Sequence, residues 1–76
     1  MELEPCYFFS EVDHRTKRVV WTEADGGARI YEPDKVQNQW TLVITDGGEK
    51  FYCNSLANVV AKLKELFPDL MFVFGA

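Results

Sequence analysis

The chain has 76 residues and a formal net charge of −4, and 47% of its residues are hydrophobic. This composition predicts one compact domain over residues 1–76 with a core of its own, and it excludes an intrinsically disordered chain. The acidic charge weighs against nucleic acid as the main partner, because phosphate binding needs a basic surface.

Two features predict a cytoplasmic protein in the reduced state. The N-terminal stretch MELEPC lacks the basic flank and apolar run of a signal peptide, and the longest apolar run, LMFVFGA, is too short to cross a bilayer. Cys6 and Cys53 are too few for a disulfide scaffold and lack the spacing of zinc ligands. We therefore expect no membrane partner and no metal.

Five segments are predicted to be strands, because each combines aromatic or β-branched residues with polar turn residues at its ends. Pro33-Asp34 ends the third of them, since proline cannot donate a hydrogen bond to a neighbouring strand. The fourth, WTLVIT, is the most β-branched run of the chain. The predicted strands cover residues 6–12, 18–23, 28–32, 40–45 and 50–53.

The tripeptide Asp-Gly-Gly occurs twice, at residues 25–27 and 46–48. Between strand-like segments it predicts a hairpin turn, because glycine reaches positive φ without a Cβ clash and the Asp carboxylate can accept from turn amides. The alternative is an anion-binding nest of glycine amides, which needs a helix N-terminus or a lysine at fixed spacing. Neither segment has one, and we interpret both as turns.

A change of period marks one helix near the C-terminus. Its apolar residues recur at intervals of three and four, which places them on one side of a helix. Ser55 is the expected N-cap, and Pro68 is expected to end the helix near Phe67. The last segment, LMFVFGA (70–76), is apolar on both alternating faces, which predicts a strand in the interior of the sheet. The apolar helix residues are Leu56, Val59, Val60, Leu63, Leu66 and Phe67.

These elements predict an α+β fold in the order β-β-β-β-β-α-β. The sheet is expected to be a mostly antiparallel meander of five to six strands, with the one amphipathic helix packed on one face. Alternation in the fourth strand places Trp40, Leu42 and Ile44 toward the core. The alternate residues Thr41, Val43 and Thr45 are expected to form the opposite surface, which tolerates solvent.

The titratable side chains form no recognisable catalytic constellation. His14 is the only histidine, and it lies in the charged segment DHRTKR, a turn that solvent reaches. Cys53 precedes the helix, where a thiol pKa can be lowered, but it is more typical of a small buried residue. Carboxylate pairs at strand ends lack the contrasting surroundings that acid–base catalysis needs. We therefore expect no enzymatic activity and no cofactor.

One helix cannot cover both faces of a five- or six-stranded sheet, so aromatic side chains are left for the second face. The sheet can curl on itself to bury them. Otherwise they form an exposed patch of the kind that binds proteins. Our leading hypothesis is a non-catalytic protein-binding module. The candidate binding residues are Tyr7, Phe9, Trp21, Arg29, Tyr31 and Tyr52.

The expected partner is a larger protein or protein complex. Small acidic α+β proteins without catalytic residues are typical of phage and mobile-element genes. There they block host or defence machinery, including the nucleic-acid-processing complexes of CRISPR systems. By this analogy of size, charge and architecture, the chain is predicted to be an inhibitor or adaptor of the anti-CRISPR-like kind, with acidic side chains in basic grooves and aromatic side chains as anchors.

Two alternatives are kept. In the first, a basic hairpin tip contacts phosphates and the chain is a small nucleic-acid-binding protein, although the neighbouring Glu11 and Asp13 weigh against it. In the second, the chain is a structural subunit of a homo-oligomer, for example a homodimer that buries the second sheet face. The residues of the hairpin tip are His14, Arg15, Lys17 and Arg18.

Overall fold

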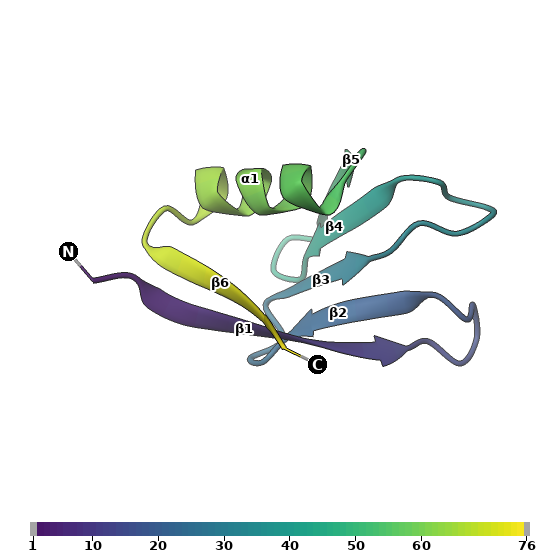
Figure 1. Ribbon diagram of the computed structural model, residues 1–76, viewed down its shortest axis with the longest axis horizontal. Helices are drawn as coiled ribbons and strands as arrows, with labels where there is room; N and C mark the ends of the chain where they lie inside the picture. Colours follow the sequence, from purple (N-terminus) through teal and green to yellow (C-terminus); the bar gives the residue numbers. More distant parts are fainter. Residues whose placement is uncertain (1, 76) are drawn as a thin grey trace.

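The computed structural model describes residues 2–75, which form one sheet and one helix in an α+β architecture (Figure 1). The elements follow the predicted order, and each strand begins and ends within two residues of its predicted bounds. They are β1 (Glu4–Val12), β2 (Val19–Glu23), β3 (Ala28–Tyr31), β4 (Trp40–Ile44), β5 (Glu49–Cys53), α1 (Leu56–Leu66) and β6 (Leu70–Gly75).

The first five strands form the predicted antiparallel meander, and β6 adds a parallel pair. The strand order is β5-β4-β3-β2-β1-β6, with β6 parallel to β1. The sheet is therefore mixed rather than a pure meander. The cause is the connection through α1, which carries the chain from β5 to the far edge of the sheet. A strand that follows such a helical crossover runs parallel to the strand before it.

The prediction that residues 70–76 form an interior strand is wrong, because β6 lies at the edge of the sheet. Its apolar character follows from packing on its faces rather than from strands on both sides. Phe72 and Phe74 pack against the core on the helix side. Met71 and Val73 point to the other face, where Met71 is 47% exposed. Residue 76 lies outside the described residues.

The core lies between α1 and one face of the sheet. Phe8, Ile30 and Leu42 contribute to it from three strands, and Val59 and Leu63 contribute from the helix. Each of these side chains is less than 2% exposed. The predicted inward series of β4 is confirmed, because Leu42 is fully buried and its neighbours on that face pack against the same cluster.

Both ends of α1 agree with the sequence prediction. Ser55 has an extended backbone, and its Oγ accepts a hydrogen bond from the Asn58 N–H at 3.1 Å. This bond satisfies one of the free amides of the first turn. At the other end, Phe67 donates its N–H to the Leu63 carbonyl, one residue before Pro68.

Both Asp-Gly-Gly segments form turns between antiparallel strands, as predicted. Gly26 and Gly47 have φ angles of 79° and 89°, in the region that favours glycine. The carboxylate that organises the first turn comes from Glu23 rather than from the Asp of the repeat. It accepts hydrogen bonds from the N–H groups of Asp25 and Gly27, at 2.6 and 3.2 Å.

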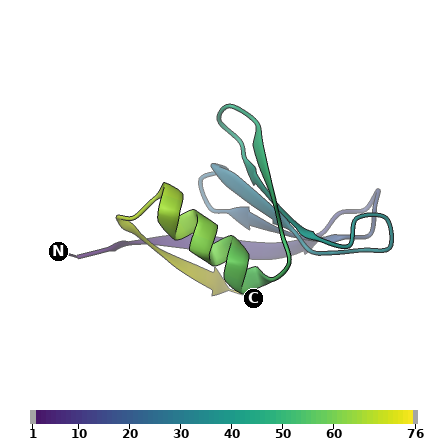
Figure 2. The ribbon, with the colours of Figure 1, turned by 90° about the horizontal axis from the view of Figure 1, so that it is seen from above.

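The molecule has two layers, and its helix covers one face of the sheet only. α1 lies across that face, and the β4–β5 hairpin bends away from the helix (Figure 2). Within residues 2–75 no helix lies over the opposite face, which we name the open face. None of the described helical residues forms a segment long and apolar enough to cross a membrane.

Candidate binding surface on the open face

The open face carries two cross-strand rows of side chains, because residues directly opposite each other on neighbouring strands project from the same face. One row contains Glu11, Val20, Tyr31, Thr41 and Tyr52. The next row contains Phe9, Thr22, Arg29, Val43 and Lys50. The meander thus brings side chains from five strands onto one surface.

Five of the six predicted protein-binding residues project from the open face. The side chains of Tyr7, Phe9 and Tyr52 are 46%, 50% and 53% exposed. Arg29 is exposed as well, and Tyr31 is half-buried among its cross-strand neighbours. These five residues therefore share one surface that a partner can reach.

Trp21, the sixth predicted residue, lies on the helix side of the sheet. Its indole N–H donates to the Glu32 carboxylate at 2.9 Å. Its ring meets the Phe74 ring edge-on, with 5.6 Å between the ring centres. Strand alternation explains this position, because Trp21 lies opposite Ile30, a fully buried core residue. Trp21 packs against the core and is separated from the other five candidates.

The end of the open face formed by β1 and β6 is apolar. Pro5 lies opposite Met71, and Tyr7 lies opposite Val73. Phe9 extends this apolar surface toward β2, where its neighbour is Thr22 and the surface becomes polar. The open face therefore joins an apolar end to a polar end over β2 to β5.

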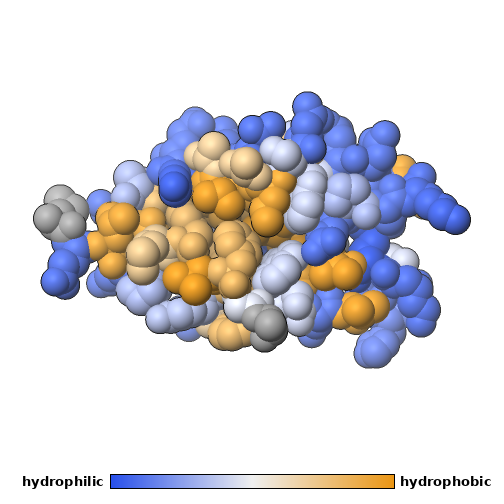
Figure 3. Space-filling view, in the orientation of Figure 1, coloured by the Kyte–Doolittle hydropathy of each residue, from blue (hydrophilic) through white to orange (hydrophobic). Residues whose placement is uncertain are grey.

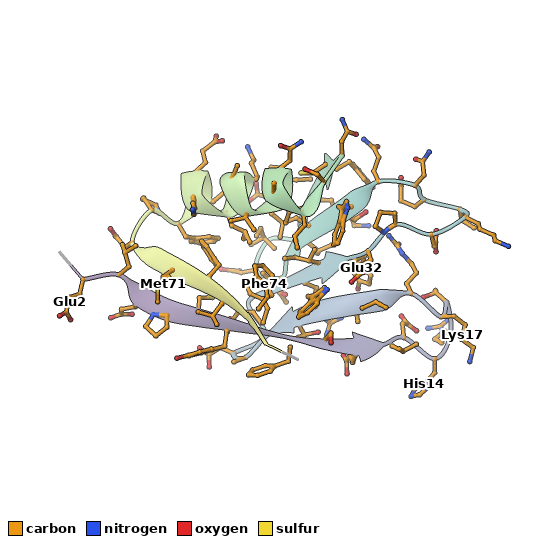
Figure 4. All side chains as sticks on the ribbon, viewed as in Figure 1. Glu2, His14, Lys17, Glu32, Met71 and Phe74 are labelled. Atoms are coloured by element: carbon orange, nitrogen blue, oxygen red, sulfur yellow. The ribbon has the colours of Figure 1, made fainter. Side chains whose placement is uncertain are left out.

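The basic hairpin tip between β1 and β2 is organised by Asp13. Its carboxylate accepts a hydrogen bond from the Arg15 N–H at 2.8 Å, and this bond is the main cause of the lowered pKa of Asp13. His14 and Lys17 point outward from the tip (Figure 4), and Lys17 has a φ of 63°. His14, Arg15 and Lys17 are exposed, so three of the four predicted tip residues are accessible to a ligand.

A depression of about 370 Å³ joins the hairpin tip to the open face. His14 and Arg15 line it from the tip, and Arg29 and Tyr31 line it from β3. Glu11 contributes a carboxylate to the same depression. The tip and the aromatic surface, which belong to different hypotheses at the level of sequence, are therefore neighbours in space.

Arg18, the fourth tip residue, is held inside the structure. Its Nε donates to the Glu32 carbonyl at 3.0 Å and lies 3.4 Å from Asp34 Oδ2. Its guanidinium carbon lies 5.2 Å from the centre of the Tyr31 ring, which makes a cation–π contact. These contacts fasten the loop that follows β3 and separate Arg18 from the exposed cations of the tip.

A second depression, of about 330 Å³, shares Tyr31 with the first, and we name it the Thr41 pocket. Thr41 is only 6% exposed, so the predicted solvent tolerance of this position is wrong. The cause is the row of side chains that places Tyr31 and Tyr52 on the strands at either side of it. The pocket is lined by Arg18, Tyr31, Gln37, Thr41, Val43, Lys50 and Tyr52.

Sequence reasoning did not identify Thr41 or Lys50 as site residues. Alternation along β4 and β5 places both on one face, but only the strand register brings them next to each other. Thr41 lies opposite Tyr52, and Lys50 lies two residues from Tyr52 on the same strand and therefore on the same face. The alternation of side chains along β4 and β5 is thus the sequence signal for this pocket. It does not predict which cations lie next to Thr41.

A groove of about 480 Å³ lies on the helix side, where Figure 3 shows apolar residues gathered over α1 and β6. Glu23, Asp46 and Glu49 bring carboxylates to its lining, and none of its lining residues is basic. Cys6 also lines the groove. Burial, together with the charges of Glu23 and Asp25, raises the pKa of the Cys6 thiol above its ordinary value. A raised pKa makes Cys6 a poor nucleophile.

Within the described residues, β1 keeps Cys6 and His14 too far apart to form a catalytic pair. His14 follows the end of β1 and Cys6 lies near its start, roughly 20 Å away along an extended strand. No three His, Cys, Asp or Glu side chains in residues 2–75 are grouped as a metal ion would require. The open face presents aromatic rings and the cations Arg29 and Lys50.

Comparison with protein-family models, with curated proteins and with solved structures finds no match to this chain. The open face and its two depressions are the features from which a function can be inferred.

Proposed function

We propose that the protein is a non-catalytic binding module that docks on a larger protein through its open face. The observation that carries this proposal is the half-exposed state of Tyr7, Phe9 and Tyr52 on a sheet face that no other described element covers. Aromatic side chains supply most of the binding free energy at many protein interfaces, because they bury a large apolar area at a low cost in conformational entropy.

The open face defines the chemistry of the partner surface. An apolar area on the partner would pack against Tyr7, Phe9 and Met71 at the apolar end. Carboxylates beside it would complement Arg29 and Lys50, which project from the polar end. This pattern fits an inhibitor or adaptor that occupies a functional surface of a larger protein.

The proposal extends to inhibitors of the phage or mobile-element type that block a nucleic-acid-processing complex. What supports it is the distribution of acidic residues. The carboxylates of Glu23, Asp46 and Glu49 gather on the helix side, away from the cations of the open face. A basic nucleic-acid-binding groove on the partner would meet these helix-side carboxylates, while the open face anchors the protein to a second part of the partner.

The test is retention of a specific partner by matched variants. Tyr7→Ser combined with Phe9→Ser removes two exposed rings of the open face. Val36→Ser is the control, because Val36 is 96% exposed and lies in the loop after β3. We expect the tagged wild-type chain and the control to retain the same protein from lysate at high salt. The double variant should retain it at least about tenfold less, since losing a hot-spot aromatic costs about 2 kcal/mol or more.

Equal retention by the double variant and by Val36→Ser would contradict docking through the open face. Circular dichroism of each variant shows that the fold is intact. Because all three positions are exposed, we expect the unfolding temperature to change little in either variant.

A nucleic-acid-binding function is the second candidate, and the depression that joins His14 and Arg15 to Arg29 and Tyr31 favours it. Cations beside an aromatic ring on a sheet form a typical single-strand binding surface. Arg15→Ala combined with Lys17→Ala tests it without touching Arg18, which holds a loop in place. Binding of single-stranded nucleic acid that falls in this variant and with rising salt would support the second candidate. The leading proposal predicts that partner retention is unaffected by it.

A homo-oligomer is the third arrangement, and β6 is the element that favours it. β6 is an apolar edge strand, and such edges pair readily with a second chain. The mass of the protein in solution tests this arrangement directly. A mass of 8.8 kDa contradicts it, and a multiple of that mass supports it.

A further inference from the structure

Thr41 presents a hydroxyl group that the fold buries without a partner. Its side chain is 6% exposed, and Oγ1 has no hydrogen-bond partner among the described residues. A buried hydroxyl without a partner destabilises a protein, whereas a valine of the same shape would be neutral or stabilising. Thr41 therefore has no packing advantage over valine, and it is one of the residues that line a pocket on the open face, with its hydroxyl oxygen buried behind the pocket surface.

Arg18 contributes a second unused donor to the same pocket. Its Nε is engaged by Glu32 and Asp34, and its guanidinium carbon lies over the Tyr31 ring. Nη2 is buried and has no acceptor within residues 2–75. Guanidinium N–H groups donate and cannot accept, so a ligand that engages this group must supply acceptor atoms.

Lys50 adds positive charge to the lining. It projects from the open face opposite Val43, and within residues 2–75 it belongs to neither of the ion pairs that the structure contains. Arg18 and Lys50 are the charged residues that line the Thr41 pocket, and no carboxylate lines it. Because Arg18 is already paired with Asp34, Lys50 is the cation of this lining that has no ion-pair partner within residues 2–75.

We propose that the Thr41 pocket is a binding site for an oxyanion, either a carboxylate or a phosphate group. The anion accepts hydrogen bonds from Thr41 Oγ1 and Arg18 Nη2 and forms an ion pair with Lys50. This site goes beyond docking through exposed aromatic residues, because it needs buried donors that the aromatic surface does not use.

Shape and charge both favour this ligand class. A volume of about 330 Å³ accommodates one such group together with the part of the molecule attached to it. Tyr31 and Tyr52 lie on either side of Thr41 and would limit the access of water. Hydrogen bonds between charged partners are about twice as strong as neutral ones, and they strengthen further where water is excluded.

The test is an NMR titration of the full chain with inorganic phosphate and, separately, with acetate, at constant ionic strength. We expect saturable shifts of backbone amide signals at residues 31, 41, 50 and 52. Thr41→Val and Lys50→Met should each weaken the binding about tenfold, because each removes a bond to a charged group. Saturation by phosphate alone assigns the site to phosphate groups, and saturation by acetate assigns it to carboxylates.

Lys64→Met is the matched control, because it removes the same charge from an exposed position on α1. We expect it to change the affinity less than about twofold, since exposed charges that far apart are screened by salt. Thr41→Val should also keep or raise the unfolding temperature, which separates loss of binding from loss of fold.

Two results would overturn the proposal. One is a set of shifts that never saturates with either anion. The other is an equal loss of affinity in Lys50→Met and Lys64→Met, because the effect would then be one of net charge alone.

Discussion

Asp34 shows at the scale of one residue how a partly exposed carboxylate organises a loop. It accepts hydrogen bonds from the N–H groups of Gln37 and Val36, at 2.7 and 2.9 Å, and it lies 3.4 Å from Arg18 Nε. These contacts lower the pKa of Asp34, with the Gln37 bond as the largest favourable cause. The ionised carboxylate is thus part of the structure that holds Arg18 and one wall of the Thr41 pocket.

The lowered pKa of Asp34 predicts a loss of stability in acid. A carboxyl group whose pKa is lower in the folded state stabilises the fold above its ordinary pKa of 3.8, and this stabilisation is lost as pH falls through the lowered value. We expect the urea concentration at the unfolding midpoint of the wild type to decrease once the pH is below about 4. In Asp34→Asn the midpoint should be lower at neutral pH, and its acid decrease should be smaller.

Urea unfolding followed by circular dichroism between about pH 7 and pH 2.5 measures both effects. Asp69→Asn is the control, because it removes a carboxyl group at an exposed position. If Asp69→Asn flattens the acid decrease as much as Asp34→Asn does, then Asp34 has no special role in it.

The β1–β2 hairpin shows at the scale of one element that a turn can hold a non-glycine residue in the left-handed backbone conformation. Lys17 has a φ of 63°, and its N–H donates to the Asp13 carbonyl at 2.7 Å. The left-handed region costs an L-residue about 1–2 kcal/mol relative to the right-handed region. The hydrogen bonds of the Asp13 turn hold Lys17 in this conformation.

Lys17→Gly is expected to raise the free energy of unfolding by about 0.5–1 kcal/mol. Relief of the left-handed backbone exceeds the extra chain entropy that glycine brings to the unfolded state. Arg15→Gly is the matched control, because Arg15 lies in the same turn without a positive φ, and there glycine should lower the stability. Urea unfolding of both variants measures the difference. A gain of equal size in both would show that the φ of Lys17 carries no cost.

The whole molecule is closed by the pairing of its two ends. β6 lies beside β1, so residues 4–9 pair with residues 70–75. Phe74 stacks on Phe8 with 5.1 Å between ring centres and meets Trp21 edge-on at 5.6 Å. These long-range contacts form only when the α1 crossover has brought β6 to the far edge of the sheet.

Phe74→Ala is expected to lower the free energy of unfolding by about 2–3 kcal/mol, at or below the lower end of the range for a buried phenylalanine because Phe74 is half-buried. The near-ultraviolet circular dichroism of Trp21 should change as well, since the ring loses its edge-on neighbour. Met71→Ala is the control on the same strand, because Met71 is 47% exposed on the other face, and it should cost less than about 1 kcal/mol. Equal costs for the two variants would mean that Phe74 does not tie β6 to β1.

Charge is also distributed at the scale of the whole molecule. Arg29 and Lys50 project from the open face, whereas Glu23, Asp46 and Glu49 line the helix-side groove. The net charge of −4 conceals this separation, because it sums both sides. The helix-side groove is thus lined by carboxylates and by no cation, whereas the open face carries Arg29 and Lys50 together with Glu11.

The sequence by itself determined the local structure of this protein. Alternation, turn glycines, the Ser55 cap and Pro68 follow from rules that act within a few residues, and the structure has the strands, turns and helix where those rules place them. The inward face of β4 was predictable for the same reason, since only one of its two faces is continuously apolar.

Only the tertiary structure decided which strands are neighbours and which side chains lie opposite each other on them. The edge position of β6, the burial of Thr41 between two tyrosines, and the place of Trp21 on the helix side all depend on strand order and register. The pairings behind these three features join residues that are 9 to 66 positions apart, so no local pattern contains them. The apolar series of β6 has the same pattern in an interior strand and in an edge strand packed under a helix, and packing alone distinguishes the two.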